Sequence, residues 1–144
     1  MISKSILNQA KSFLCWEKFS DLSITLIQLD HAIGFYYPPK TALHTILLFY
    51  EKNQNDFTKP LCLLFHEAGH LVQYNQYDKT GTKNQYQEHL NSRDTDQRLK
   101  FEEDAWRLGK SLFTEFCARY QIGTHLIEDY DSYQKECLNT YMSK

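Results

Sequence analysis

The sequence predicts a small α+β domain, and three observations support this class. The chain has 144 residues, of which 42% are hydrophobic and 24% charged, and such values are ordinary for one globular domain with its own core. Residues 22–51 are rich in β-branched and aromatic side chains, which is typical of strands. The flanking segments carry apolar residues at helical spacing. We therefore expect a single domain over residues 1–144, with a mixed sheet of three to five strands beside helices.

The first third of the chain predicts a helix followed by strands. Residues 4–19 have apolar side chains along one side of a helix. Strands are expected at residues 22–29, 33–37 and 43–51, and a proline pair ends the second of them. The third strand contains "HTILLFY", which is continuously apolar in its middle.

Three further helices are predicted after the strands. The first begins at Asp56 or Thr58, either of which would be its N-cap, and runs to about Gln76. The segment 78–93 is polar with one glycine and is expected to be a loop. The last two helices are expected at about residues 95–120 and 126–141.

Composition argues against several classes of protein. A net charge of -2 without a basic run argues against binding to nucleic acid or to anionic lipid. The longest apolar runs are far too short to span a membrane. The cysteines Cys15, Cys62, Cys117 and Cys137 are widely spaced, which argues against a zinc ribbon or a redox motif. Free thiols, buried at Cys62 and Cys117, and a reducing cytoplasm are expected.

The segment "LLFHEAGHLVQY" has an apolar helical face and a polar one. His66, Glu67 and His70 share the polar face. Residues at i and i+4 lie one turn apart, so the two imidazoles can converge on one metal ion, while Glu67 can reach a water on that ion. This H-E-x-x-H spacing is typical of zinc hydrolases in which the glutamate is the general base. Gly69 costs about 1 kcal/mol relative to alanine, which predicts close packing of a neighbouring backbone.

A catalytic zinc site takes a third protein ligand and keeps one position open for water. In "KFEEDAWRLGKSLFTEFCARY" a helical wheel directs Glu102 into an apolar arc, Glu103 to its edge and Asp104 to solvent. A carboxylate in a core must be paired, protonated or metal-bound, so Glu102 is either a ligand or half of a buried salt bridge with an arginine or lysine. Besides the carboxylates, the other candidates are His31, His44, His89 and His125.

The two motifs together resemble a known family. H-E-A-G-H, followed about thirty residues later by E-x-x-A in a helix, resembles the zincin metallopeptidases of the gluzincin group. "FHEAGHLVQY" with "FEEDAWRLG" is similar to the ImmA/IrrE-type intracellular metallopeptidases, which commonly read H-E-x-x-H and then E-x-x-A-N-x-F-A. The resemblance covers residues 22–113.

This resemblance implies a small zincin-like domain with zinc bound by His66, His70 and Glu102 and with Glu67 as general base. It implies hydrolysis of a peptide bond in a protein or peptide substrate. It also implies that the "HTILLFY" strand is a sheet edge able to pair with an extended substrate.

Some positions depart from the family pattern. Trp106 stands where asparagine is frequent, and Leu108-Gly109 replace Phe-Ala. The group that would orient a ligand histidine is therefore not identified. A second electrophile beside zinc would stabilise the oxyanion. Its candidates are Tyr74, Tyr77, His125, Tyr130 and Tyr133.

Two other classes stay open. One is a catalytically inactive zincin-fold regulatory or binding module with a structural zinc, which a fourth ligand from His89 or His125 would favour. The other is a globular domain without a metal. The sequence does not indicate an oligomeric state.

Overall fold

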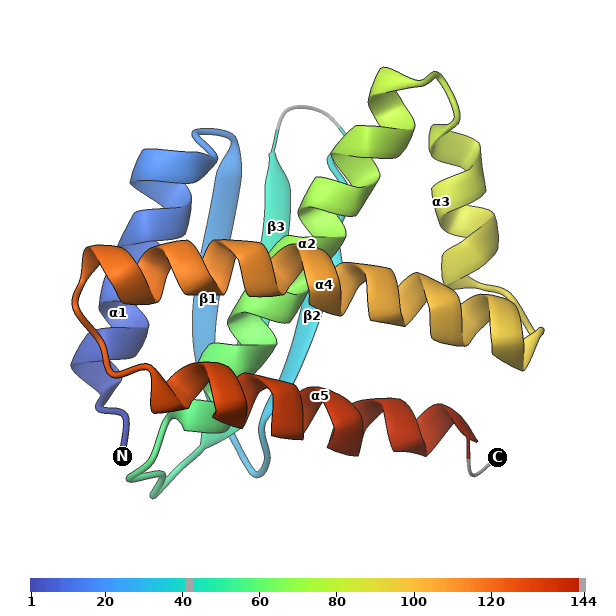
Figure 1. Cartoon of the computed structure of the whole chain (residues 1–144). Coiled ribbons are helices and arrows are strands. Elements are labelled where there is room, and N and C mark those ends of the chain that lie inside the picture. Colours follow the sequence, from blue (N-terminus) through green and yellow to red (C-terminus); the bar gives the residue numbers. More distant parts are fainter. Residues whose placement is uncertain (41–42, 143–144) are drawn as a thin grey trace.

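The computed structural model describes residues 1–40 and 43–142 and confirms the α+β class. The N-terminal helical segment and the helices of the second half of the chain lie on the same side of the sheet, because the ring of Phe13 packs against those of Phe65 and Phe116 (Figure 1). In order, the elements are α1 (Lys4–Ser12), a π-helical segment (Phe13–Lys18), β1 (Leu22–Leu29), β2 (Ile33–Tyr37), β3 (His44–Glu51), α2 (Thr58–Lys79), α3 (Lys83–Leu90), α4 (Thr95–Arg119) and α5 (His125–Met142).

The strands of the described chain form a three-stranded mixed sheet in the order β1-β3-β2. β3 pairs in parallel with β1 and antiparallel with β2. The expectation that "HTILLFY" forms a sheet edge is therefore wrong, because this strand is the central one. The edge strands of this sheet are β1 and β2.

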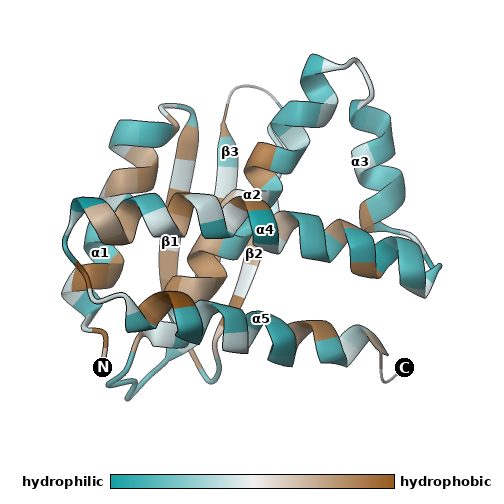
Figure 2. Ribbon diagram, viewed as in Figure 1, coloured by the Kyte–Doolittle hydropathy of each residue, from teal (hydrophilic) through white to brown (hydrophobic). Residues whose placement is uncertain are grey.

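α2 packs on one face of the sheet and is covered in turn by α4. β3 directs His44, Ile46, Leu48 and Tyr50 to the buried face, and the residues between them are partly exposed. α4 and α5 cross in front of α2 (Figure 1). The hydrophobic residues gather on the strands and the first half of α2, whereas α3 is mostly hydrophilic (Figure 2).

α2 and α4 cross with their backbones in close contact. A Cβ atom on Gly69 would lie 2.0 Å from the carbonyl oxygen of Ala105. On the other helix, a Cβ atom on Gly109 would lie 2.3 Å from the carbonyl oxygen of Phe65. The expected reason for a glycine within the motif helix is confirmed. This crossing brings the histidine-bearing turns of α2 beside Glu102.

Two helical segments differ from expectation. The predicted helix 4–19 is α1 followed by a π-helical segment, in which the Phe19 N–H donates to the carbonyl oxygen of Leu14, five residues back, at 2.8 Å. The segment 78–93, expected to be a loop, contains the end of α2 and all of α3. Tyr86 of α3 is fully buried, so one aromatic side chain anchors an otherwise polar helix.

The start of α2 is displaced by one residue from each predicted cap. Phe57 occupies the N-cap position, and neither Asp56 nor Thr58 does. The Asp56 carboxylate still accepts hydrogen bonds from the Thr58 N–H at 3.1 Å and the Ile2 N–H at 3.0 Å. Hydrogen bonds from Thr58 and Ile2 lower the pKa of Asp56. Asp56 therefore ties the N-terminus to α2.

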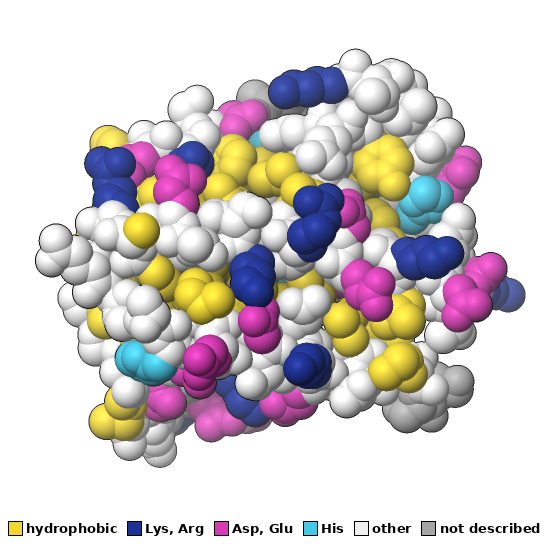
Figure 3. All heavy atoms as spheres, in the orientation of Figure 1, with side chains coloured by type: hydrophobic (Ala, Val, Ile, Leu, Met, Phe, Trp, Pro, Cys, Tyr) yellow, Lys and Arg dark blue, Asp and Glu magenta, His cyan; other side chains and the backbone are white. Residues whose placement is uncertain are grey.

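The surface agrees with the modest net charge. Acidic and basic side chains are interspersed on the face shown in Figure 3. Within the part of the chain that the structure describes, no helix combines the length and the hydrophobicity that a membrane crossing requires. The four cysteines are free, and Cys62 and Cys117 are buried as predicted.

Candidate metal centre

The polar face of the motif helix is buried beneath α4. His66, Glu67 and His70 are 7%, 7% and 5% exposed, respectively. Glu102, on the apolar arc of α4, is 4% exposed. Both helices therefore direct ionisable side chains into one buried region, which costs free energy unless those groups are paired or bind an ion.

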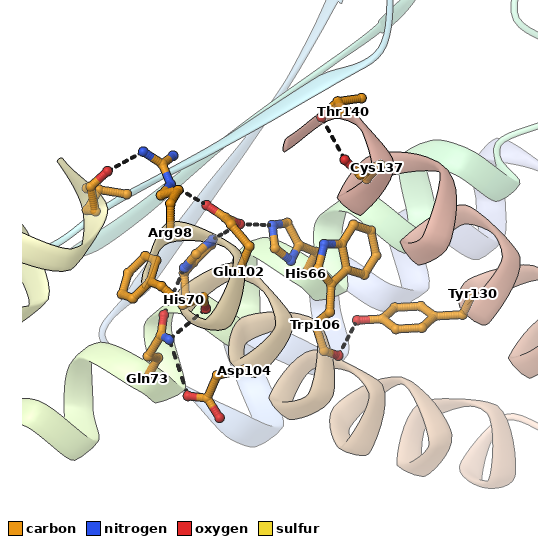
Figure 4. Close-up of polar contacts among 12 residues, drawn as sticks. His66, His70, Gln73, Arg98, Glu102, Asp104, Trp106, Tyr130, Cys137 and Thr140 are labelled. Atoms are coloured by element: carbon orange, nitrogen blue, oxygen red, sulfur yellow. Dashed lines mark hydrogen bonds and ion pairs between the residues drawn. The ribbon is translucent and has the colours of Figure 1, made fainter. Parts of the chain in front are cut away.

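His66, His70 and Glu102 converge on one point. Glu102 Oε2 lies 3.2 Å from Nε2 of His66 and 3.2 Å from Nε2 of His70 (Figure 4). Ligands about 2.0–2.1 Å from a tetrahedral ion lie roughly 3.3–3.4 Å from one another, so the observed spacings match such a site. This buried group could hold a metal ion, and it is the one such group within residues 1–40 and 43–142.

The two oxygens of Glu102 have different partners. Oε2 faces the two histidines, and Oε1 accepts a hydrogen bond from Nε of Arg98 at 3.2 Å. Burial acts to raise the pKa of Glu102, but hydrogen bonds from His66 and His70 outweigh it and hold the pKa well below its ordinary value. Glu102 is therefore ionised, as a metal ligand must be. The salt bridge with an arginine is therefore present at one oxygen, while the other oxygen faces the two histidines.

His70 is oriented by Gln73, which the sequence did not identify. His70 Nδ1 lies 3.0 Å from Oε1 of this buried glutamine. Gln73 Nε2 donates to the carbonyl oxygen of Phe101 at 3.0 Å and to Oδ2 of Asp104 at 3.2 Å, so its oxygen is the atom left to face His70. His70 Nδ1 therefore carries a proton, and Nε2, which faces Oε2 of Glu102, is the nitrogen that would bind an ion once its own proton is released. In the sequence, a single glutamine one turn after His70 on a helix with many apolar residues could have indicated this contact.

Asp104 corrects the helical-wheel expectation. It was predicted to point to solvent, but it is half-buried and accepts hydrogen bonds from Gln73 and Arg107. The cause is the contact between α2 and α4, which places Gln73 beside this side of α4. Glu103 is exposed, as expected.

His66 is held mainly by stacking. Its ring lies against the indole of Trp106, with ring centroids 4.1 Å apart and an interplanar angle of 18°. Tyr130 supports Trp106 from behind, because its hydroxyl donates to the Trp106 carbonyl oxygen at 2.9 Å. His66 Nδ1 is buried and has no hydrogen-bond partner among the described residues. Trp106, at the position where the resembled pattern has asparagine, therefore orients a histidine by a flat contact.

Glu67 lies next to the cluster on α2 and faces β2. A Cβ atom on Gly34 of β2 would lie 2.9 Å from Cγ of Glu67 and 3.3 Å from its Oε1. A side chain at position 34 would therefore displace this carboxylate. Glu67 also lines the cleft that leads to the cluster, which is the placement that a general base requires.

A cleft of about 730 Å³ opens onto the cluster. Residues 32–38, which include β2, form one part of its wall, and α2, α3, α4 and α5 supply the rest. Most of the lining outside the cluster is apolar or aromatic. Within it, Glu67 and Arg98 are the charged side chains besides the cluster itself. Such a mixture of apolar walls and few polar groups is typical of a binding site.

Comparisons of this chain with protein-family models, with curated proteins and with solved structures found no match. The resemblance to zincin metallopeptidases therefore rests on the two sequence motifs alone. The chemistry of the site has to follow from its own geometry.

The five residues considered as the second electrophile differ in their position relative to the cleft. Tyr133 lines the cleft. Tyr130 is buried and engaged with a carbonyl oxygen, and Tyr77 faces His89 Nδ1 with its hydroxyl at 2.9 Å. Tyr74 is outside the cleft lining, and His125 lines a separate pocket of about 320 Å³. Of the five, Tyr133 alone keeps a place at the site.

Four further tyrosines line the cleft and were missed: Tyr36 and Tyr37 of β2, Tyr86 and Tyr141. Tyr86 comes from α3, which was expected to be a loop, and Tyr141 comes from the last turns of α5. Burial raises the pKa of these last two phenols, and the charges of Glu67 and Glu102 raise it further. Both hydroxyls therefore stay protonated and can donate hydrogen bonds. In the sequence, Tyr86 and Leu90 are spaced by one helical turn, and this spacing could have indicated that the segment is a helix.

The other histidines lie outside the cluster. His44 is buried under the sheet with Nδ1 2.6 Å from the Tyr36 hydroxyl and Nε2 3.3 Å from Asp21. His89 faces Tyr77, as described above. Within the described residues, the group that could hold a metal ion does not include any of the four histidines considered as alternative third ligands, which are His31, His44, His89 and His125.

Proposed function

We propose that the protein is a zinc-dependent metallopeptidase of zincin type that hydrolyses peptide bonds of an intracellular protein substrate. The observation that carries this proposal is the convergence of His66, His70 and Glu102 at the spacing of a tetrahedral metal site, with Glu67 beside them in the cleft. Two imidazole nitrogens and one carboxylate oxygen form a donor set typical of catalytic zinc, whereas calcium and magnesium prefer oxygen donors. The free cysteines agree with a reducing, cytoplasmic location.

Zinc held by these three residues would act as a Lewis acid that makes a water molecule more acidic. Glu67 would accept the proton of the attacking water and then deliver it to the leaving amine. Gln73 and Trp106 would keep the two imidazoles in place during these transfers. Phenols that line the cleft, among them those of Tyr86, Tyr133 and Tyr141, would donate hydrogen bonds to the oxyanion that develops at the carbonyl group.

The substrate would bind along β2. This strand pairs with β3 through one edge, and its residues line the cleft. An unpaired strand edge can add an extended peptide by main-chain hydrogen bonds. β2 therefore takes the role that the sequence suggested for β3.

A structural zinc in an inactive regulatory module is the alternative. It would be favoured by a fourth protein ligand, but His89 and His125 lie elsewhere in the described structure. Three ligands beside a cleft support an open coordination position. The enzyme is therefore the better proposal.

Metal analysis of protein expressed with zinc supplied tests the site. Wild type, Glu67→Gln and Glu103→Gln are expected to hold about one equivalent of zinc, and His66→Ala and Glu102→Gln to lose it. Glu103→Gln is the matched control, because Glu103 is the exposed neighbour of Glu102 on the same helix. About a tenth of an equivalent or less in wild type would end the proposal.

Cleavage of a proteome-derived peptide mixture, read as new peptide termini, tests the activity. Glu67→Gln is expected to lower the cleavage rate by roughly 100-fold or more with zinc and fold retained, because the proton acceptor is removed. Undiminished cleavage by Glu67→Gln would contradict the general-base assignment. Zinc binding without cleavage by wild type would instead favour the inactive module.

A further inference from the structure

Arg98 contacts the oxygen of Glu102 that the histidines leave free. Its Nε donates to Oε1 at 3.2 Å, whereas Oε2 lies 3.2 Å from Nε2 of both His66 and His70. Figure 4 shows the guanidinium and the two imidazoles approaching the carboxylate from different directions. The two oxygens of Glu102 therefore have separate partners.

The far end of Arg98 is held as well. Its Nη1 donates to the carbonyl oxygen of Leu90, the last residue of α3. The guanidinium carbon lies 5.6 Å from the ring centroid of Tyr141 in α5. A planar guanidinium with contacts to α3, α4 and α5 has a defined direction, although 29% of the side chain is exposed. Among the described residues, Arg98 is the one lysine or arginine that lines the cleft.

We propose that Arg98 is a positioning residue that makes Glu102 a one-oxygen ligand, an inference that rests on the proposed zinc site. A carboxylate can offer a metal ion either one oxygen or two. His66, His70 and a single oxygen leave one of the four tetrahedral positions for water, whereas a second oxygen would fill it. A charge-assisted hydrogen bond from Arg98 engages Oε1 and withholds it from the metal. Arg98 thereby preserves the position at which Glu67 activates water.

An arginine–glutamate ion pair at the other end of α4 provides a control. Arg119 Nε lies 3.1 Å from Oε2 of Glu17, far along the helix from the cleft-lining residues. If the Arg98 pair only stabilised the fold, removing either arginine would leave metal coordination unchanged. If Arg98 positions Glu102, only its removal alters the coordination of the metal.

The test uses the full chain loaded with Co²⁺, whose visible absorption reports its coordination geometry. Acetohydroxamate, added as a probe, binds where the metal has an open position and shifts the absorption band. Wild type and Arg119→Met are expected to bind the probe alike. Arg98→Met is expected to bind Co²⁺ with a changed spectrum and to lose about 10-fold or more in probe affinity.

The outcomes separate this inference from the proposed function. Equal spectra and equal probe affinity for Arg98→Met and Arg119→Met would overturn the role of Arg98 and leave the metal site standing. No Co²⁺ uptake by wild type would overturn the metal site itself. Arg98→Gln, which keeps a polar side chain, is expected to change in the same direction as Arg98→Met and decides the question if the methionine variant does not fold.

Discussion

The two histidines of the cluster are oriented by different physical interactions. Gln73 accepts a hydrogen bond from His70 and is itself locked by two acceptors on α4, the Phe101 carbonyl oxygen and Asp104. His66 has no such bond and relies on the face of Trp106. A hydrogen bond sets the tautomer of an imidazole, whereas stacking sets only its plane. We therefore expect Gln73 to affect the affinity of the proposed metal site more than Trp106 does.

Gln73→Leu should weaken zinc binding by about 10- to 100-fold, because His70 Nδ1 loses its acceptor. Competition with a chromophoric chelator measures the affinity. Gln76→Leu is the matched control, since Gln76 is exposed on the same helix and should leave the affinity unchanged. Equal affinities of the two variants would contradict the role of Gln73.

At the scale of elements, the crossing of α2 and α4 assembles the site. Gly69 and Gly109 allow the backbones to meet, and His70 and Glu102 come together beside that contact. The sequence predicted that Gly69 packs against a neighbouring backbone but not which one. Helix α3 was missed because its polar composition outweighed the single buried Tyr86.

Gly69→Ala should destabilise the protein, although alanine is the better helix former by about 1 kcal/mol. The new methyl group would overlap the Ala105 carbonyl oxygen, and such overpacking typically costs about 1–3 kcal/mol. Urea denaturation measures the free energy of unfolding. Ser111→Ala on an exposed position of α4 should change it by less than about 0.5 kcal/mol. An unchanged or raised stability of Gly69→Ala would show that the helices separate freely.

At the scale of the whole molecule, the sheet and its covering helices bury His44 as a neutral side chain. Burial lowers the pKa of His44 below its ordinary value, although the Asp21 carboxylate opposes the shift. The Tyr36 hydroxyl and Asp21 suit the neutral ring, because Nδ1 can accept from the phenol while Nε2–H faces the carboxylate. The unfolded chain therefore binds a proton at a higher pH than the folded one.

The stabilisation that neutral His44 provides should be complete above its unfolded pKa of about 6.5 and lost as the pH falls below that value. One proton limits the slope to about 1.4 kcal/mol per pH unit. Urea unfolding of wild type and His44→Gln between pH 7.5 and 5.5 checks this, and the stability advantage of wild type should shrink on acidification. A constant difference across this range would show that His44 does not titrate on unfolding.

The sequence by itself determined the spacing of His66, Glu67 and His70 and the burial of Glu102, because helix periodicity alone decides which side chains share a face. Only the tertiary structure decided that β2 rather than β3 borders the cleft, because pairing order depends on how distant segments meet. It also decided what orients each histidine of the cluster. Gln73 acts through acceptors on another helix, and no local pattern encodes that contact.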